Sequence, residues 1–191
     1  MSVTISFELS DSDLEHFQAM AREAQEAASS SGLTAVQIVD AAEQLLAASR
    51  DFEKMPNFIK ERLEKLSILV KLVRDEEWRL PEPDQRGVLN ALAYFADPED
   101  LIPDRVPGIG FLDDAIMAEL VAESLATDIS AYQQFDAYRA SEERRRKLKG
   151  LDTHVGREEW LADKRVMLHN RLRELREERM ESSSPPIIRL W

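Results

Sequence analysis

Apolar residues recur every three or four positions along most of this chain, which is the period of an amphipathic helix. The spacing predicts helices over about 12–28, from 34 onward, over about 56–78 and 85–96, around 116–125, and over about 129–149 and 156–180. Ser12 with Glu15 and Thr34 with Gln37 fit capping boxes at the first two starts. Gly150 is expected to follow the end of the helix over about 129–149, a position that glycine often occupies. The pattern therefore predicts an all-α protein, a single helical domain of six to eight helices.

One segment departs from the helical period. Residues 3–9, VTISFEL, alternate between apolar and polar side chains and are rich in β-branched residues, so they favour a short strand. A single strand needs an edge to pair with. We therefore expect this N-terminal strand to pair elsewhere, with another chain or against the helices.

Charge divides the chain into two parts. The formal net charge of the 191 residues is −12, yet residues 141–191 hold 13 Lys and Arg against 10 Asp and Glu. This predicts an acidic helical body over 1–150, followed over 151–191 by a charged amphipathic helix and an extended C-terminal tail. Because phosphates repel an acidic surface, the composition argues against nucleic acid as a partner.

The chain has no cysteine. This excludes disulfides, cysteine nucleophiles and thiolate metal sites, and it is typical of a reducing compartment, so we expect a cytoplasmic protein. The longest apolar run without charge, GVLNALAYFA at 87–96, is about half the roughly 18 residues of a spanning helix, and no transmembrane segment is expected. The final amphipathic helix could lie on a membrane, but the acidic body disfavours anionic lipids, so we expect no peripheral contact.

Residues 98–114, PEDLIPDRVPGIGFLDD, crowd three prolines, two glycines and five carboxylates into a short corner. Their plainest role is structural, with Asp113 capping the following helix and Asp114 in its first turn. The alternative is that the side chains of Asp100, Asp104, Asp113 and Asp114 converge. Clustered carboxylates need protons or a hard cation between them, so this alternative predicts a metal site for Mg²⁺ or Ca²⁺. The spacing leaves both interpretations open.

The segment YFADPEDLIPDRVPGIGFLDDAIM, residues 94–117, resembles the signature of the YkvA-like family, also called DUF1232. The positions in register with that signature are Tyr94, Pro98, Asp100, Leu101, Ile102, Pro103, Asp104, Pro107, Gly110, Asp113 and Asp114. With its flanking helices, the resemblance covers a core of about 85–125. It implies a shared structural motif and no particular activity, because the family has no established common activity or catalytic residues.

The sequence contains no other recognisable catalytic motif. The three histidines, His16, His154 and His169, form no recognised metal spacing, and no G-x-S-x-G or phosphate-binding glycine loop is present. The basic run RRRKLK at 144–149 fits the negative end of a helix better than a nucleic-acid site. The sequence therefore favours a protein that is not an enzyme without deciding the question, and the catalytic residues, if there are any, stay unknown.

Two C-terminal features offer surface to a partner. In the last predicted helix, a narrow apolar seam is formed by Leu161, Leu168, Leu172 and Leu175 and is broadened by Trp160 and Met167. This seam either packs on the body or docks another protein. The tail, PPIIRLW, carries large apolar side chains that a partner could cover, at Ile187, Ile188, Leu190 and Trp191.

From these features we predict a non-enzymatic, cytoplasmic helical protein that acts by protein–protein interaction, as an adaptor or a homo-oligomer. The alternative is a divalent-cation-dependent enzyme or ligand-binding module at the acidic corner, with Mg²⁺ or Ca²⁺ as its cofactor.

Overall fold

The computed structural model describes residues 8–50, 55–96, 102, 106 and 109–181. Within these residues the chain forms α1 Asp11–Ser30, α2 Ala35–Arg50, α3 Asn57–Arg74, α4 Glu82–Leu92, the 3₁₀ turn η1 Ala93–Ala96, α5 Leu112–Ser124, α6 Ala126–Leu148 and α7 Arg157–Glu181. The prediction of an all-α fold is confirmed. The predicted strand lies largely outside the described residues, and its last two positions, Glu8 and Leu9, are not in a strand.

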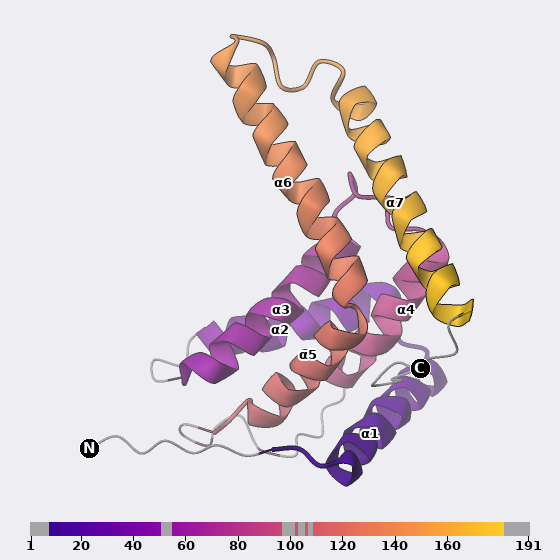
Figure 1. Ribbon diagram of the computed structural model, residues 1–191. Coiled ribbons are helices and arrows are strands. Elements are labelled where there is room, and N and C mark those ends of the chain that lie inside the picture. Colours follow the sequence, from indigo (N-terminus) through magenta and orange to yellow (C-terminus); the bar gives the residue numbers. More distant parts are fainter. Residues whose placement is uncertain (1–7, 51–54, 97–101, 103–105, 107–108, 182–191) are drawn as a thin grey trace.

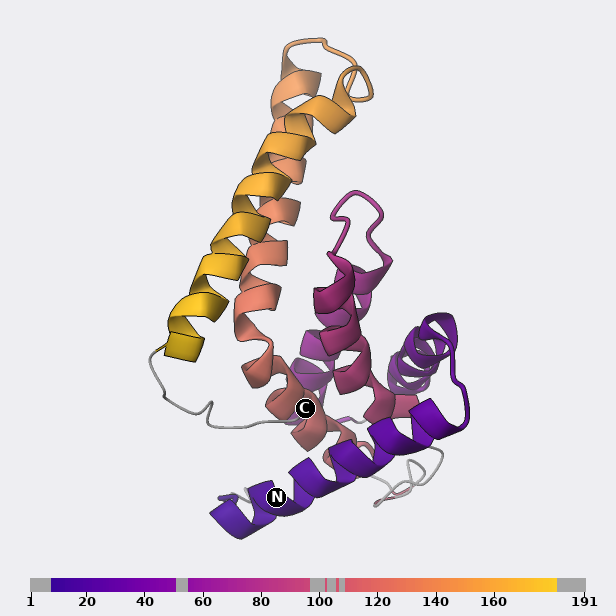
Figure 2. The ribbon, with the colours of Figure 1, turned by 90° about the vertical axis from the view of Figure 1, so that its right-hand side faces the viewer.

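The helices divide into a body and an arm. Helices α1–α5 pack together, and α6 and α7 rise from them as an antiparallel hairpin, here called the arm (Figures 1 and 2). The closed end of the arm, residues 149–156, lies away from the body, and Gly150 follows α6 there with a φ of 64°, as predicted. Only Leu125 separates α5 from α6, so the arm grows directly out of the body. No helix among the described residues is long and apolar enough to cross a membrane.

A single hydrophobic core joins the body and the arm. Its largest fully buried side chains are Trp78, Phe111, Phe135, Ile59, Leu66, Leu69, Leu72, Leu92, Met117, Leu161, Leu172 and Val39. Because Leu161 and Leu172 belong to α7, the last helix packs on the rest of the fold through one of its faces.

Local hydrogen bonds set the first two helix starts. At α1 the capping box joins Ser10 and Asp13, whose Oδ2 accepts from the Ser10 N–H at 2.8 Å. The predicted box of Ser12 with Glu15 is therefore wrong. The box that forms begins two residues earlier, at Ser10, and an aspartate takes the place of the glutamate. The second predicted box is confirmed, since Gln37 Oε1 accepts from the Thr34 N–H at 2.9 Å.

Helix α3 ends at Arg74, earlier than the apolar period predicts. The reason is Asp75, whose Oδ1 accepts the N–H of Glu77 at 2.9 Å and of Trp78 at 3.1 Å. A side chain that binds these donors offers the backbone an alternative to the helix. The chain then turns at Arg79, which has a φ of 51°, while Trp78 is fully buried. This α3–α4 turn lies against the arm.

Candidate functional site

The acidic corner leads into α5. The N-cap of this helix is Phe111, in the left-handed region at φ 65° and without a side-chain capping hydrogen bond. The prediction that Asp113 caps the helix is wrong, because the chain enters earlier, through a turn in which the Gly110 N–H donates to the Val106 carbonyl at 2.8 Å. Asp113 and Asp114 both lie in the first turn of α5, where their charge faces the positive end of the helix dipole.

Asp113 ties the corner together. The residue is 3% exposed, and its Oδ2 accepts a hydrogen bond from the Ile102 N–H at 3.0 Å. Its Oδ1 is buried and has no hydrogen-bond partner among the residues that the structure describes. A buried carboxylate oxygen without a donor is costly, so a proton, a cation or a further donor would stabilise it.

The structure describes two of the four predicted metal ligands. Asp113 and Asp114 are adjacent in α5 and both buried, whereas Asp100 and Asp104 lie outside the described residues. Across the described part of the chain, no group of three or more side chains is placed to hold a metal ion. The metal-site alternative therefore rests on Asp113 and Asp114.

The remaining motif positions are described in part. Tyr94, Ile102 and Gly110 are described, and the positions outside the described residues are Pro98, Leu101, Pro103 and Pro107. Tyr94 lies in η1, is buried, and packs edge-on against Phe95 with ring centroids 5.3 Å apart. Tyr94 is thus part of the hydrophobic core.

The α3–α4 turn anchors the arm through Trp78. The indole contacts Tyr132 and Phe135 of α6, with ring centroids 5.9 and 5.1 Å away, and His169 of α7 at 4.4 Å. Burial lowers the pKa of His169, which keeps the imidazole neutral beside the indole at pH 7. One side chain of the body therefore joins both helices of the arm.

Ion pairs surround the same turn. Glu77 pairs with Arg157 of α7 and, at 2.9 Å, with Arg139 of α6, and these guanidinium groups lower the pKa of its carboxyl. Asp75 pairs with Arg139 at 2.8 Å. Arg165 of α7 is 7% exposed and donates to the Glu77 carbonyl oxygen at 2.8 Å. The α3–α4 turn thus binds arginines of both arm helices, α6 and α7.

A second contact holds the other end of α7. Arg176 pairs with Asp84 in the first turn of α4 and with Asp128 in the first turn of α6. Burial raises the pKa of Asp128, and the charge of Arg176 opposes that shift. The three side chains border a pocket of about 450 Å³. Arg176 therefore joins α7 to both α4 and α6 through ion pairs.

The predicted partner-binding residues fall into three groups. Leu161 and Leu168 are 1% and 3% exposed and pack on the chain's own core, which is the intramolecular alternative. Trp160 and Leu175 are partly exposed. The tail positions lie outside the described residues and stay a prediction, namely Ile187, Ile188, Leu190 and Trp191.

The apolar face predicted for α7 includes Met167 but not Val166, which lies on the exposed side of the helix. Val166 and Met167 are 55% and 51% exposed. Each residue of a helix is rotated by about 100° from the one before, so Val166 lies about 200° around the helix from the buried Leu168. A helical projection centred on Val166, and not on the leucines, would have indicated this second apolar patch.

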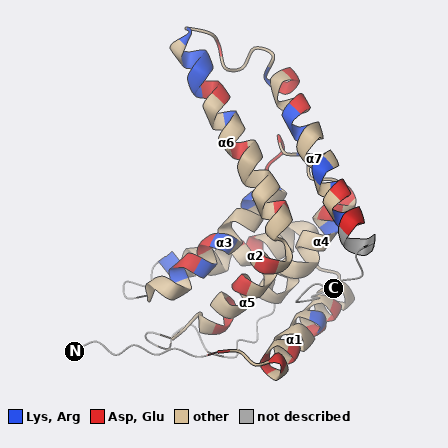
Figure 3. Cartoon of the chain, in the orientation of Figure 1, with Lys and Arg blue, Asp and Glu red and all other residues tan. Residues whose placement is uncertain are grey.

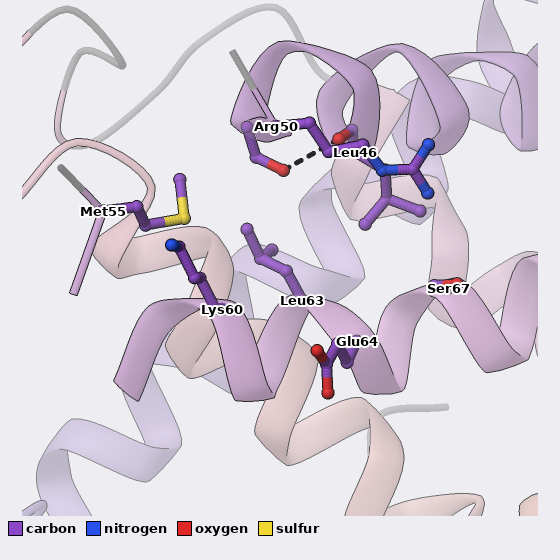
Figure 4. A pocket seen from close by; sticks show the side chains of 8 residues that line it. Leu46, Arg50, Met55, Lys60, Leu63, Glu64 and Ser67 are labelled. Carbon is purple, nitrogen blue, oxygen red and sulfur yellow. Dashed lines mark hydrogen bonds between the residues drawn. The ribbon is translucent and has the colours of Figure 1, made fainter. Parts of the chain in front are cut away.

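A pocket of about 370 Å³ lies between the end of α2 and the start of α3 (Figure 4). It is lined by Leu46, Ser49, Arg50, Met55, Lys60, Leu63, Glu64 and Ser67. The Ser49 hydroxyl donates to the Leu46 carbonyl at 2.8 Å. This lining combines the apolar side chains of Leu46, Met55 and Leu63 with charges of both signs.

Residues 87–120 match the family model described as "Protein of unknown function (DUF1232)". The matched segment covers the second half of α4, the acidic corner and most of α5. No curated protein and no solved structure shows significant similarity to the chain. The match supports the DUF1232 resemblance for this segment, and the finer YkvA-like assignment stays a prediction.

Proposed function

We propose that this protein acts by protein–protein interaction and that α7 joins two copies of the chain. The observation that carries the proposal is the exposed apolar pair Val166 and Met167, in the middle of a long helix. The buried side of the same helix holds Leu161, Leu168 and Leu172 in the core. Apolar side chains on the open side of a helix favour packing against a second helix.

The charges beside this pair support a second copy as the partner. Glu159 and Asp163 precede the pair, Arg171 and Arg173 follow it, and all four are exposed; Arg171 pairs with the exposed Glu174 of its own helix at 3.3 Å. In an antiparallel contact with a two-fold axis at residues 166–167, Arg173 of one copy lies on the side of the other copy that carries Glu159 and Asp163. Charge complementarity of this kind favours the antiparallel register.

The expected dimer is weak. A single pair of helices buries less than the roughly 1,600 Å² of a standard interface, so the dimer should form and dissociate with concentration. The proposal assigns no catalytic group. The absence of cysteine supports a reducing compartment, such as the cytoplasm, as the place where the protein acts.

The double substitution Val166→Glu/Met167→Glu is expected to weaken the dimer at least about hundredfold, because it places unpaired charges in the contact. Light scattering over a concentration series measures the mass. The matched control Gln133→Glu/Ala137→Glu adds the same charge at exposed positions of α6 and should leave the dimer intact. A wild-type mass that stays monomeric at every concentration, or an equal effect of both variants, contradicts the proposal.

A second candidate function is a cation-dependent site at the acidic corner, which the buried Oδ1 of Asp113 favours. Calorimetric titration of Mg²⁺, Mn²⁺ and Ca²⁺ tests it. Stoichiometric binding that Asp113→Asn abolishes, and that Glu123→Gln on the exposed side of α5 preserves, supports the site. No binding by the wild type removes this candidate and leaves Asp113 with its structural hydrogen bond.

A further inference from the structure

The closed end of the arm presents large apolar side chains to solvent. Leu148, Leu151 and Val155 are 89%, 51% and 67% exposed. Hydrogen bonds hold the loop in shape, since the Leu151 N–H donates to the Arg146 carbonyl at 3.0 Å and the Arg146 guanidinium donates to the Val155 carbonyl at 3.1 Å. The exposure therefore belongs to a hydrogen-bonded loop.

Cations accompany these apolar side chains. Residues 144–156, here called the arm tip, contain five Lys and Arg and a single acid, in a chain whose net charge is −12. Lys147 and Lys149 stand on either side of Leu148, and both are exposed. In Figure 3 the blue of Lys and Arg is gathered at this end of α6. The arm tip is thus both basic and apolar.

Most acids beside the arm tip are already engaged, but Glu159 is exposed and its carboxylate lies next to Gly156 of the tip. Glu142 pairs with Arg145, and Glu143 pairs with Arg157 at 2.7 Å. Asp152, the acid of the tip itself, accepts a backbone N–H of its own loop at 2.8 Å. With Glu159 counted beside Asp152, the tip still keeps an excess of cations, of which Lys147 and Lys149 are exposed.

The arm also separates the tip from the acidic surface of the body. The acids of α1 lie at the opposite end of the molecule from the tip (Figures 1 and 3). The body acids Asp75, Glu77 and Asp84 contact the arm and are paired there with Arg139, Arg157 and Arg176. Charges are screened over about 8 Å at physiological ionic strength, whereas the 23 residues of α6 span about 35 Å. The acids of α1 therefore do not cancel the positive potential of the tip.

We infer that the arm tip docks on a membrane surface that carries anionic lipids. Three apolar side chains, one at the end of α6 and two in the loop that follows, bury too little area for a standard protein interface of about 1,200–2,000 Å². A bilayer surface accepts such a tip, because the apolar side chains enter the boundary of the acyl chains while the lysines stay with the headgroups.

This inference departs from the expectation that composition alone supports. The acidity of the body predicts no peripheral membrane contact, but the sequence does not show how far the cations of residues 144–149 lie from the acids of the body. The arm gathers cations and apolar side chains at one end, away from the acids of α1. The inference stands independently of the proposed pairing of α7.

Co-sedimentation of the full chain with vesicles tests it. The wild type should sediment with phosphatidylcholine vesicles that contain phosphatidylserine, and not with phosphatidylcholine alone. Leu148→Ser/Leu151→Ser/Val155→Ser is expected to weaken binding at least about tenfold. Lys147→Gln/Lys149→Gln should weaken it about 30-fold, since each cation near an anionic surface contributes about fivefold.

The matched control is Val36→Ser/Phe58→Ser, which removes exposed apolar side chains from the body and should bind like the wild type. Circular dichroism verifies that each variant is folded. A dye on Leu151→Cys, in a chain without other cysteines, should shift its emission to the blue when vesicles are added.

Four results overturn the inference: no binding, equal binding to neutral vesicles, undiminished binding by the tip variants, or binding to polyglutamate but not to vesicles. The last result points to an acidic protein as the partner of the tip.

Discussion

Replacing Trp78 with alanine is expected to destabilise the protein by about 3–5 kcal/mol, a large share of the roughly 5–15 kcal/mol that stabilises a typical domain. Trp78 is fully buried between Tyr132 and Phe135 of α6 and His169 of α7. The substitution leaves a cavity and removes contacts to both arm helices at once, so α7 should be released first. Denaturant unfolding measures the loss, and amide hydrogen exchange locates it.

Trp78→Phe is the matched control for this experiment. It keeps an aromatic ring, and the indole N–H that it removes has no hydrogen-bond partner among the residues described. We expect Trp78→Phe to lower the free energy of unfolding by less than about 2 kcal/mol. An unchanged unfolding midpoint for Trp78→Ala, or equal losses for both variants, would show that Trp78 does not anchor the arm.

Asp75→Ala is expected to destabilise the protein by about 3 kcal/mol, because several buried donors lose one acceptor together. The Asp75 carboxylate accepts from the N–H groups of Glu77 and Trp78, accepts from the Tyr132 hydroxyl at 3.0 Å, and pairs with Arg139. Burial and the Asp75 charge raise the pKa of Tyr132, so its hydroxyl remains a donor at neutral pH. Denaturant unfolding at constant pH measures the change.

Asp152→Ala provides the comparison, because Asp152 also accepts a backbone N–H within a turn but is exposed. Asp152→Ala should lower the free energy of unfolding by less than about 1 kcal/mol. If the two aspartate variants unfold at the same denaturant concentration, the hydrogen bonds of Asp75 do not stabilise the α3–α4 turn as described.

The apolar period located the helices well because each helix buries one face in a shared core. It placed the end of α3 too late, since the period continues through Val73 toward Trp78 while a side-chain hydrogen bond of Asp75 ends the helix. Periodicity reports which side chains are buried and does not report where a local acceptor competes with the helix. The same limit explains the misplaced capping box at Ser12.

The candidate sites were harder to predict than the fold. The contacts that anchor the arm join residues far apart in the chain, such as Glu77 with Arg157 and Asp84 with Arg176, and no local pattern marks them. The family signature drew attention to Asp113 but not to its bond with the Ile102 N–H. A seam of leucines is easy to see in a sequence, whereas the role of Val166 on the exposed side of α7 becomes clear only once burial is known.

A single introduced cysteine tests the α7 contact most directly, because the chain has none of its own. In an antiparallel pair with its axis at residues 166–167, the two copies bring position 166 close enough to itself for a disulfide. Mild oxidation is predicted to convert the Val166→Cys protein into a covalent dimer, while Ala137→Cys, exposed on α6, stays monomeric on a non-reducing gel. If Val166→Cys crosslinks no faster than Ala137→Cys, α7 does not join two copies, and the proposed function is contradicted.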